Sequence, residues 1–321
     1  MFADTWQIVL SVLGVFLVMA LGAYCRRTQW LTPAADRSLA NLTAKVLLPA
    51  LFVDRILGGQ RFDSLLETWV PPAFGFGITV MGLLMGLAVA KTLGTWMGLA
   101  DPASARSFAL GVGICNYGYI PLPLAERFYS DAVVDLILHN VGVDLALWSV
   151  GIAIISGGKS SGRPWWRLIL SPPLVAVLIA VTLKQTGAAA FVPDPILQAT
   201  GKLGSCAIPL GLLLSGALII DFLREADWKG AGRTIVVAIL FRQAWMPVLM
   251  LGIATLLIER VEMKQVLMLQ AAMPAAVFPI VLARLYDRDT ATALRVVLST
   301  SIAGIVLVPL WLAIGKWWLG V

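Results

Sequence analysis

GVGICNYGYIPLPLAE, residues 111–126, interrupts a long apolar segment with three glycines, one asparagine and two prolines. Each proline lacks an N–H and clashes with the carbonyl four residues earlier, which predicts that the carbonyls of Tyr117 and Tyr119 lose their helical donors. Unwound backbone at membrane depth is tolerated only where it is buried in protein or lines a polar cavity. Asn116 supplies an amide donor and acceptor at the break. We therefore expect a broken helix that forms a binding site; the alternative is a proline-kinked packing helix with no ligand.

A second stretch of the same kind, residues 271–286, reads AAMPAAVFPIVLARLY. A shift of 158 positions places Asn116 on Pro274 and Pro121 on Pro279. Two broken helices at equivalent positions in two halves are typical of a transporter whose binding site lies between structural repeats. The pattern therefore predicts a transporter binding site at the interface between the two repeats.

The composition indicates a polytopic membrane protein. Hydrophobic residues make up 59% of the 321 residues and charged residues only 13%, whereas soluble domains carry about 25% charged residues. The net charge of +6 is spread over short loops rather than gathered in one patch, so nucleic-acid binding is not expected. Three cysteines do not make a disulfide framework, and we expect small buried apolar residues instead.

The hydropathy pattern predicts an all-α membrane protein with ten transmembrane helices, because each apolar run is long enough to cross a core of about 30 Å. The expected spans are 6–24, 35–57, 68–90, 104–126, 133–155, 168–186, 196–220, 233–257, 265–286 and 294–318. Residues 157–167 form a short connecting loop between a first half, 1–156, and a second half, 168–321. The two halves also share a proline pattern, KVLLP at 45–49 and SCAIP at 205–209.

The basic residues predict the orientation. The loops after spans 1, 3, 5, 7 and 9 hold 14 Lys or Arg, against 8 in the other loops and the termini. Because basic loops stay in the cytoplasm, both termini are expected outside the plasma (bacterial inner) membrane. An odd number of spans per half then makes the halves inverted repeats.

Three ionisable side chains fall near the middle of predicted spans: Lys45, Asp144 and Arg242. Charges at the bilayer centre are costly, so such residues pair or line a pathway. Asn140 lies one helical turn before Asp144, and Gln243 follows Arg242. We expect Asp144 to bond a basic or amide side chain. Two interpretations stay open: a polar relay that supports the site, or a static ion pair of Asp144 with Lys45 or Arg242.

An enzyme is not expected. An aspartyl protease needs two aspartates in the membrane, and only Asp144 lies in the middle of a span. The single histidine, His139, cannot build a multi-histidine metal site, so neither a metal nor a cofactor is expected. His139 lies near the outer end of its span, where a solvated or packing role is favoured over proton transfer.

Five stretches resemble the auxin efflux carrier family. They are NLTAKVLLPALF (41–52), GICNYGYIPLPLAERFY (113–129), LSPPLVAVLIAVTL (170–183), LGSCAIPLGLLLSGALI (203–219) and AAMPAAVFPIVLARLY (271–286). They are similar to that family's second, fourth, sixth, seventh and ninth helices, in the same order. The likeness covers nearly the whole chain.

The resemblance implies two inverted five-helix repeats in which helices 4 and 9 are broken and cross near the midplane. It also implies a homodimer, a scaffold of helices 1, 2, 6 and 7, and a transport domain that moves against it. The short central loop is similar to the compact bacterial branch, which is associated with small carboxylates such as malate or malonate, whereas plant members export indole-3-acetate.

Carried onto this chain, the resemblance places the crossing at Asn116, Tyr117, Pro121, Pro274 and Pro279, with Lys45 as a supporting charge. Tyr117, Tyr119 and Phe278 are expected to form an aromatic wall beside Asn116.

The sequence thus predicts a secondary transporter of a small organic anion, acting as an exporter by an elevator-type motion. The half-helix N-termini at the breaks present N–H groups and positive dipole ends, which suit a carboxylate without any buried cation. The alternatives are a channel or membrane sensor on the same fold, and a sodium- or proton-coupled symporter.

Overall fold

The computed structural model describes residues 2–59, 65–99, 101–157 and 171–321. The connecting loop predicted at 157–167, apart from Gly157, lies outside the described residues. Within the described residues the chain is helical throughout, and the only β pairing is an isolated antiparallel bridge, so the all-α class is confirmed.

Helices of the first half follow the predicted spans, with interruptions. In chain order they are α1 (Phe2–Arg27), α2 (Pro33–Leu42), η1 (Thr43–Leu47), α3 (Leu48–Gly58), α4 (Leu65–Met97), α5 (Pro102–Gly113), α6 (Pro121–Phe128), η2 (Ser130–Ala132), α7 (Val133–Ala146), η3 (Leu147–Gly151) and α8 (Ile152–Ser156).

The second half has the same kind of order. Its described helices are α10 (Pro172–Thr186), η4 (Ala188–Phe191), α11 (Asp194–Ser205), α12 (Ala207–Glu225), α13 (Gly232–Leu240), η5 (Phe241–Trp245), α14 (Met246–Leu257), α15 (Val261–Ala272), α16 (Phe278–Leu285) and α17 (Thr290–Leu319).

Six helices or helical runs among the described residues are long and apolar enough to cross a membrane. The two broken segments are not among them, because each half-helix is shorter than a bilayer is thick. The count of ten spans therefore stays a prediction.

Three π-helical turns interrupt the long helices, at η1, η3 and η5. Pro49 and Pro247 each lie in the first turn of the α-helix that follows η1 or η5. Because proline has no N–H to donate to the carbonyl four residues earlier, the preceding turn loses a helical hydrogen bond and widens. Lys45 lies in η1, and Arg242 and Gln243 lie in η5.

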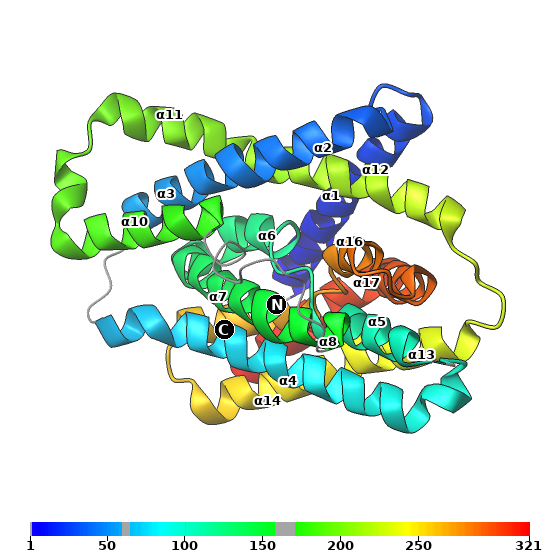
Figure 1. Ribbon diagram of the computed structural model, residues 1–321. Helices are drawn as coiled ribbons and strands as arrows, with labels where there is room; N and C mark the ends of the chain where they lie inside the picture. The colour runs from blue at the N-terminus through cyan, green and yellow to red at the C-terminus, as the bar shows by residue number, and fades with distance from the viewer. Residues whose placement is uncertain (1, 60–64, 100, 158–170) are drawn as a thin grey trace.

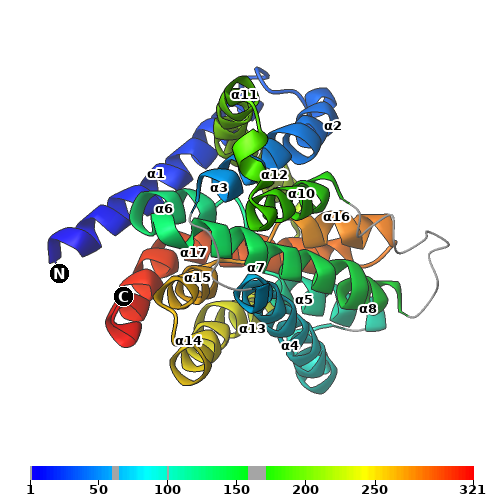
Figure 2. The same ribbon diagram turned by 90° about the vertical axis from the view of Figure 1, so that its left-hand side faces the viewer.

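The helices form two groups, which we call the first bundle and the second bundle (Figures 1 and 2). The first bundle comprises α1, α2, α3, α10, α11 and α12; the second comprises α4 to α8 and α13 to α17. Both views show α2, α3, α10 and α11 on one side of α4, α13 and α14.

Close backbone contact holds α1 against α12 in the first bundle. A Cβ on Gly216 would lie 1.8 Å from the carbonyl oxygen of Met19. Only glycine fits there, and small residues at such a contact are how membrane helices approach closely.

Candidate functional site

The two predicted breaks are present and meet each other. α5 ends at Gly113 and α6 begins at Pro121, while α15 ends at Ala272 and α16 begins at Phe278. The extended residues between them form the antiparallel bridge, from Cys115 to Ala275. We call this meeting point the crossing.

Two backbone hydrogen bonds join the breaks. The Asn116 N–H donates to the Pro274 carbonyl over 2.8 Å, and the Ala276 N–H donates to the Ile114 carbonyl over 2.9 Å. Asn116 and Pro274 are the positions that the 158-residue shift equates. Each break therefore satisfies part of the backbone that the other leaves without helical partners.

Gln270, in the last turn of α15, is the centre of the side-chain network at the crossing. Its Nε2 donates to the Tyr117 carbonyl (3.1 Å) and to Asn140 Oδ1 (3.0 Å). Its Oε1 accepts from Cys115 Sγ over 3.2 Å. The side chain is fully buried and joins both breaks to α7. Sequence reasoning missed Gln270, although an uncharged polar residue three positions before a break was a usable signal.

Arg242 supports the second break from η5. Its side chain is 1% exposed, and its Nε and Nη2 each donate over 3.0 Å, to the carbonyls of Met273 and Gln270 respectively. The Gln270 carbonyl also accepts from the Met273 N–H over 3.2 Å. Both carbonyls lie at the C-terminus of α15, where a cation is favourable. No carboxylate of the described residues lies within ion-pair distance of Arg242.

Gln243 reaches a different helix. Its Nε2 donates to the Thr300 carbonyl over 3.0 Å, and the Thr300 hydroxyl accepts from the Ala275 N–H over 3.2 Å. The second break is therefore held from both η5 and α17. Gln243 Oε1 is buried and has no partner among the described residues.

The prediction that Asp144 bonds a basic or amide side chain was wrong. Asp144 Oδ1 accepts from the hydroxyl of Tyr117 over 2.6 Å. Neither Lys45 nor Arg242 is within ion-pair distance of it. The unwound backbone lets the Tyr117 ring leave its own helix and reach α7. A phenol donating to a carboxylate makes a short, charge-assisted hydrogen bond. Asn140 and Asp144 do share the α7 face toward the crossing, as their spacing predicted.

The three aromatic residues of the predicted wall lie against different helices. Tyr119 packs so closely on α12 that a Cβ on Gly211 would lie 2.0 Å from its ring. Phe278 meets Trp148 edge to face, with ring centroids 5.4 Å apart. In the described part of the chain, no ring contact joins Tyr117, Tyr119 and Phe278.

Lys45 and His139 lie away from this network. The Lys45 side chain is exposed on η1. His139 is 2% exposed, and neither ring nitrogen has a partner in the described ranges. Of the two roles expected for His139, the structure shows burial by packing rather than solvation.

The half-helix N-termini offer fewer donors than the sequence argument assumed. At α6, Pro121 and Pro123 have no N–H, and the Leu122 N–H donates to the Gly118 carbonyl over 3.1 Å. At α16, Pro279 has none and the Ile280 N–H donates to the Val277 carbonyl over 3.1 Å. The positive charge at the crossing therefore comes mainly from Arg242.

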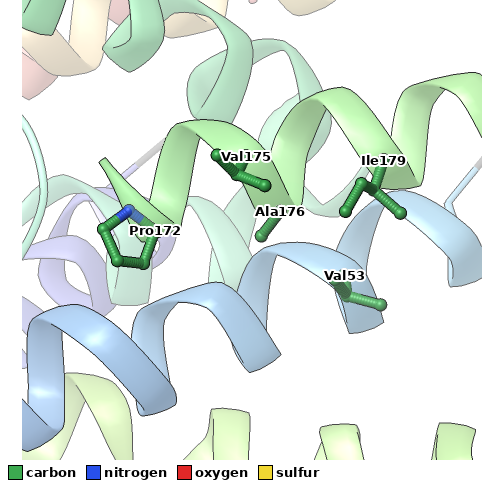
Figure 3. A pocket seen from close by; sticks show the side chains of 5 residues that line it. All are labelled: Val53, Pro172, Val175, Ala176 and Ile179. Atoms are coloured by element: carbon green, nitrogen blue, oxygen red, sulfur yellow. The ribbon is translucent and has the colours of Figure 1, made fainter. Parts of the chain in front are cut away.

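An apolar hollow of about 460 Å³ lies between α3 and α10 (Figure 3). Its lining residues are Val53, Pro172, Val175, Ala176 and Ile179. None of these side chains carries a hydrogen-bonding group, so the hollow does not suit a small anion.

Comparison with known proteins agrees with the resemblance. The sequence model of a family described as "Membrane transport protein" matches residues 7–312. A protein of Methanothermobacter thermautotrophicus, named an uncharacterized transporter, is 27% identical over 305 residues, covering 94% of this chain and 96% of the relative. An uncharacterized transporter of Methanocaldococcus jannaschii is 23% identical over the same shares.

Proposed function

Because the chain belongs to the membrane transport protein family, that of the auxin efflux carriers, we propose that it is a secondary transporter of a small organic anion. The single observation that carries the choice of an anion is Arg242. A buried guanidinium bonded to neutral carbonyls leaves a positive charge at the crossing. Burying an unpaired charge is costly, and a carboxylate is the chemistry that would compensate it.

The groups around the first break suit the rest of such a ligand. Asn116 is half-buried and brings an amide, and its own N–H is already used by Pro274. Asp144 is engaged by Tyr117, so its negative charge is held by a hydrogen bond beside the crossing. The substrate class is therefore a carboxylate whose remaining groups contact the amide and the aromatic residues.

The transport motion that we propose is a displacement of the second bundle past the first. The crossing belongs to the second bundle, so the ligand would travel with it. We further propose ten spans in two inverted five-helix repeats, a homodimer, and both termini outside. With the cytoplasm negative, moving one negative charge outward gains about 2.3 kcal/mol per 100 mV, which favours export without a coupling ion.

Binding by matched arginine variants tests the anion site. Arg288 also donates to two carbonyls, Ile155 and Ser156 at the end of α8, which makes Arg288→Gln the control for Arg242→Gln. We expect Arg242→Gln to weaken the binding of malonate, malate or indole-3-acetate by roughly ten- to a hundred-fold, because hydrogen bonds to charged groups contribute about 1.5–3 kcal/mol. Arg288→Gln should leave affinity unchanged. Unchanged affinity in folded Arg242→Gln protein would contradict the site.

Counterflow in proteoliposomes tests the transport class. Saturable exchange of radiolabelled malonate is expected of a carrier, whereas a channel or sensor gives none. Replacing sodium with choline should not slow the exchange if no sodium is coupled.

Labelling of single cysteines tests the orientation. On a cysteine-free background, cysteines at Thr5 and in the loop 159–163 should react from opposite sides of the membrane, because basic loops stay inside. Reaction of both from outside would overturn the inverted repeats.

A further inference from the structure

Among the residues that the structure describes, two ion pairs join helices of different bundles. On α3, Arg55 Nε donates to Glu126 Oε1 of α6 over 2.8 Å, and its Nη1 reaches the neighbouring Asp54 over 3.1 Å. On α16, Arg284 pairs with Glu225, the last residue of α12. In both cases the second bundle contributes the last turn of a half-helix.

One member of each pair has a counterpart in the other pair under the internal repeat. The shift of 158 positions that places Asn116 on Pro274 also places Glu126 on Arg284. Their partners, Arg55 and Glu225, lie on α3 and α12, the helices that begin within KVLLP and SCAIP, although they do not occupy equivalent positions there. The charges are exchanged: the second bundle supplies the acid in one pair and the base in the other.

The two pairs use different helices of each bundle, α3 with α6 and α12 with α16. Figure 1 shows α6 near the middle and α16 to its right, with α3 running to the left and α12 to the right. The Arg284 guanidinium also lies 5.1 Å from the centroid of the Phe222 ring on α12. This cation–π contact adds to the hold on the second pair.

We propose that Arg55–Glu126 and Arg284–Glu225 are paired latches that hold the two bundles in the present arrangement and must open when the second bundle moves. The proposal rests on the bundle motion of the proposed function. α6 and α16 both belong to the second bundle, so one displacement separates both acids from both arginines. Because the two charges on the second bundle are opposite, a single charge on the first bundle cannot re-pair with both.

The contacts are suited to a latch because they are weak. All four side chains are between 26% and 50% exposed. Ion pairs of that exposure change an equilibrium by up to about five-fold. They can therefore bias the bundle arrangement and still open in each transport cycle.

Charge-exchange variants test the latches with a distance measurement. Spin labels at Phe191 of the first bundle and Trp69 of the second, with the native cysteines replaced by alanine, report the bundle separation. Glu126→Arg and Arg55→Glu should each shift the population of the present distance by about two- to five-fold, and the double exchange should restore it. Glu225→Arg and Arg284→Glu, which exchange the charges of the second pair, should shift the same distance population, and their double exchange should restore it.

The control is an ion pair within the second bundle. Arg260 bonds Asp135 of α7 over 2.9 Å, so Arg260→Gln should leave the distance distribution unchanged. Unshifted distances in the single exchanges, or a double exchange that fails to restore them, would overturn the latches.

Transport measurements distinguish failure of the latch proposal from failure of the proposed transport function. If the wild type exchanges malonate but the charge-exchange variants leave the spin-label distances unchanged, the latch proposal is overturned and the transport proposal is not. If the charge-exchange variants do shift the spin-label distances but the protein exchanges no anion, the transport proposal is overturned. The two ion pairs would then be contacts between mobile bundles without that function.

Discussion

The first break and the second break meet at one point but are built differently. The first, from Ile114 to Ile120, carries its own polar side chains, including Asn116 and Tyr117. The second, from Met273 to Val277, is apolar and is held by groups from neighbouring helices, Arg242 of η5 and Thr300 of α17. The internal repeat thus equates the backbones of the two breaks but not their chemistry. We expect ligand recognition to depend on the side chains of the first break together with the charge of Arg242, and structural support to be concentrated at the second break.

Loss of Gln270 should have the largest effect on stability, because this side chain joins both breaks. Gln270→Leu leaves the Tyr117 carbonyl, Asn140 and Cys115 without their partners. Each buried polar group left unpaired costs about 1–3 kcal/mol, so we expect a loss of about 3 kcal/mol or more. Thermal unfolding in detergent measures it, with the exposed Gln198→Leu as the matched control. Equal melting of the two variants would refute the division of roles.

Loss of Asn116 should weaken binding rather than folding. Its backbone N–H makes the bond to Pro274, and that bond survives truncation of the side chain. Asn116→Ala should weaken malonate binding by roughly ten- to a hundred-fold if the amide bonds the carboxylate, with expression and dimerisation unchanged. The proposed difference between the two breaks would be wrong if Asn116→Ala lowered the stability and left the affinity for malonate unchanged.

Asp144 and Tyr117 should show a graded response. Asp144→Asn keeps an oxygen that can accept from the Tyr117 hydroxyl, whereas Asp144→Leu leaves that hydroxyl unpaired. We expect Asp144→Asn to unfold close to the wild type and Asp144→Leu to lose about 1–3 kcal/mol. Tyr117→Phe removes the other half of the bond and completes a double-mutant cycle with Asp144→Leu. An additive cycle would show that the bond contributes nothing.

The sequence predicted the breaks because their signals are local. Proline, glycine and asparagine restrict the backbone where they stand, and the repeat related Asn116 to Pro274 across the halves. The partners could not be predicted, since Gln270 and Cys115 are brought together by tertiary packing and lie far apart along the chain.

Lys45 and Arg242 show the same limit. Both are mid-span cations in a π-helical turn before a proline, yet Lys45 is exposed and Arg242 is buried at the crossing. A π-turn inserts a residue into the helical register, so the faces assigned from a 3.6-residue period no longer hold beyond it. Lys45→Ala should therefore affect binding at the crossing less than Arg242→Gln does.

Replacement of Pro121 should have the smallest effect. The sequence pattern made this proline a cause of the break, because it predicted that the Tyr117 carbonyl would lose its helical donor. In the structure, however, Pro121 is the first residue of α6, a position where the missing N–H is unneeded. The break lies before it and is fixed by the bonds of Asn116 to Pro274 and of Ala276 to Ile114. We therefore expect Pro121→Ala to change stability by less than about 1 kcal/mol and malonate affinity by less than about five-fold. Thermal unfolding and malonate binding, measured beside Asn116→Ala, check this expectation. A loss of binding as large as that of Asn116→Ala would show that Pro121 is needed to form the break.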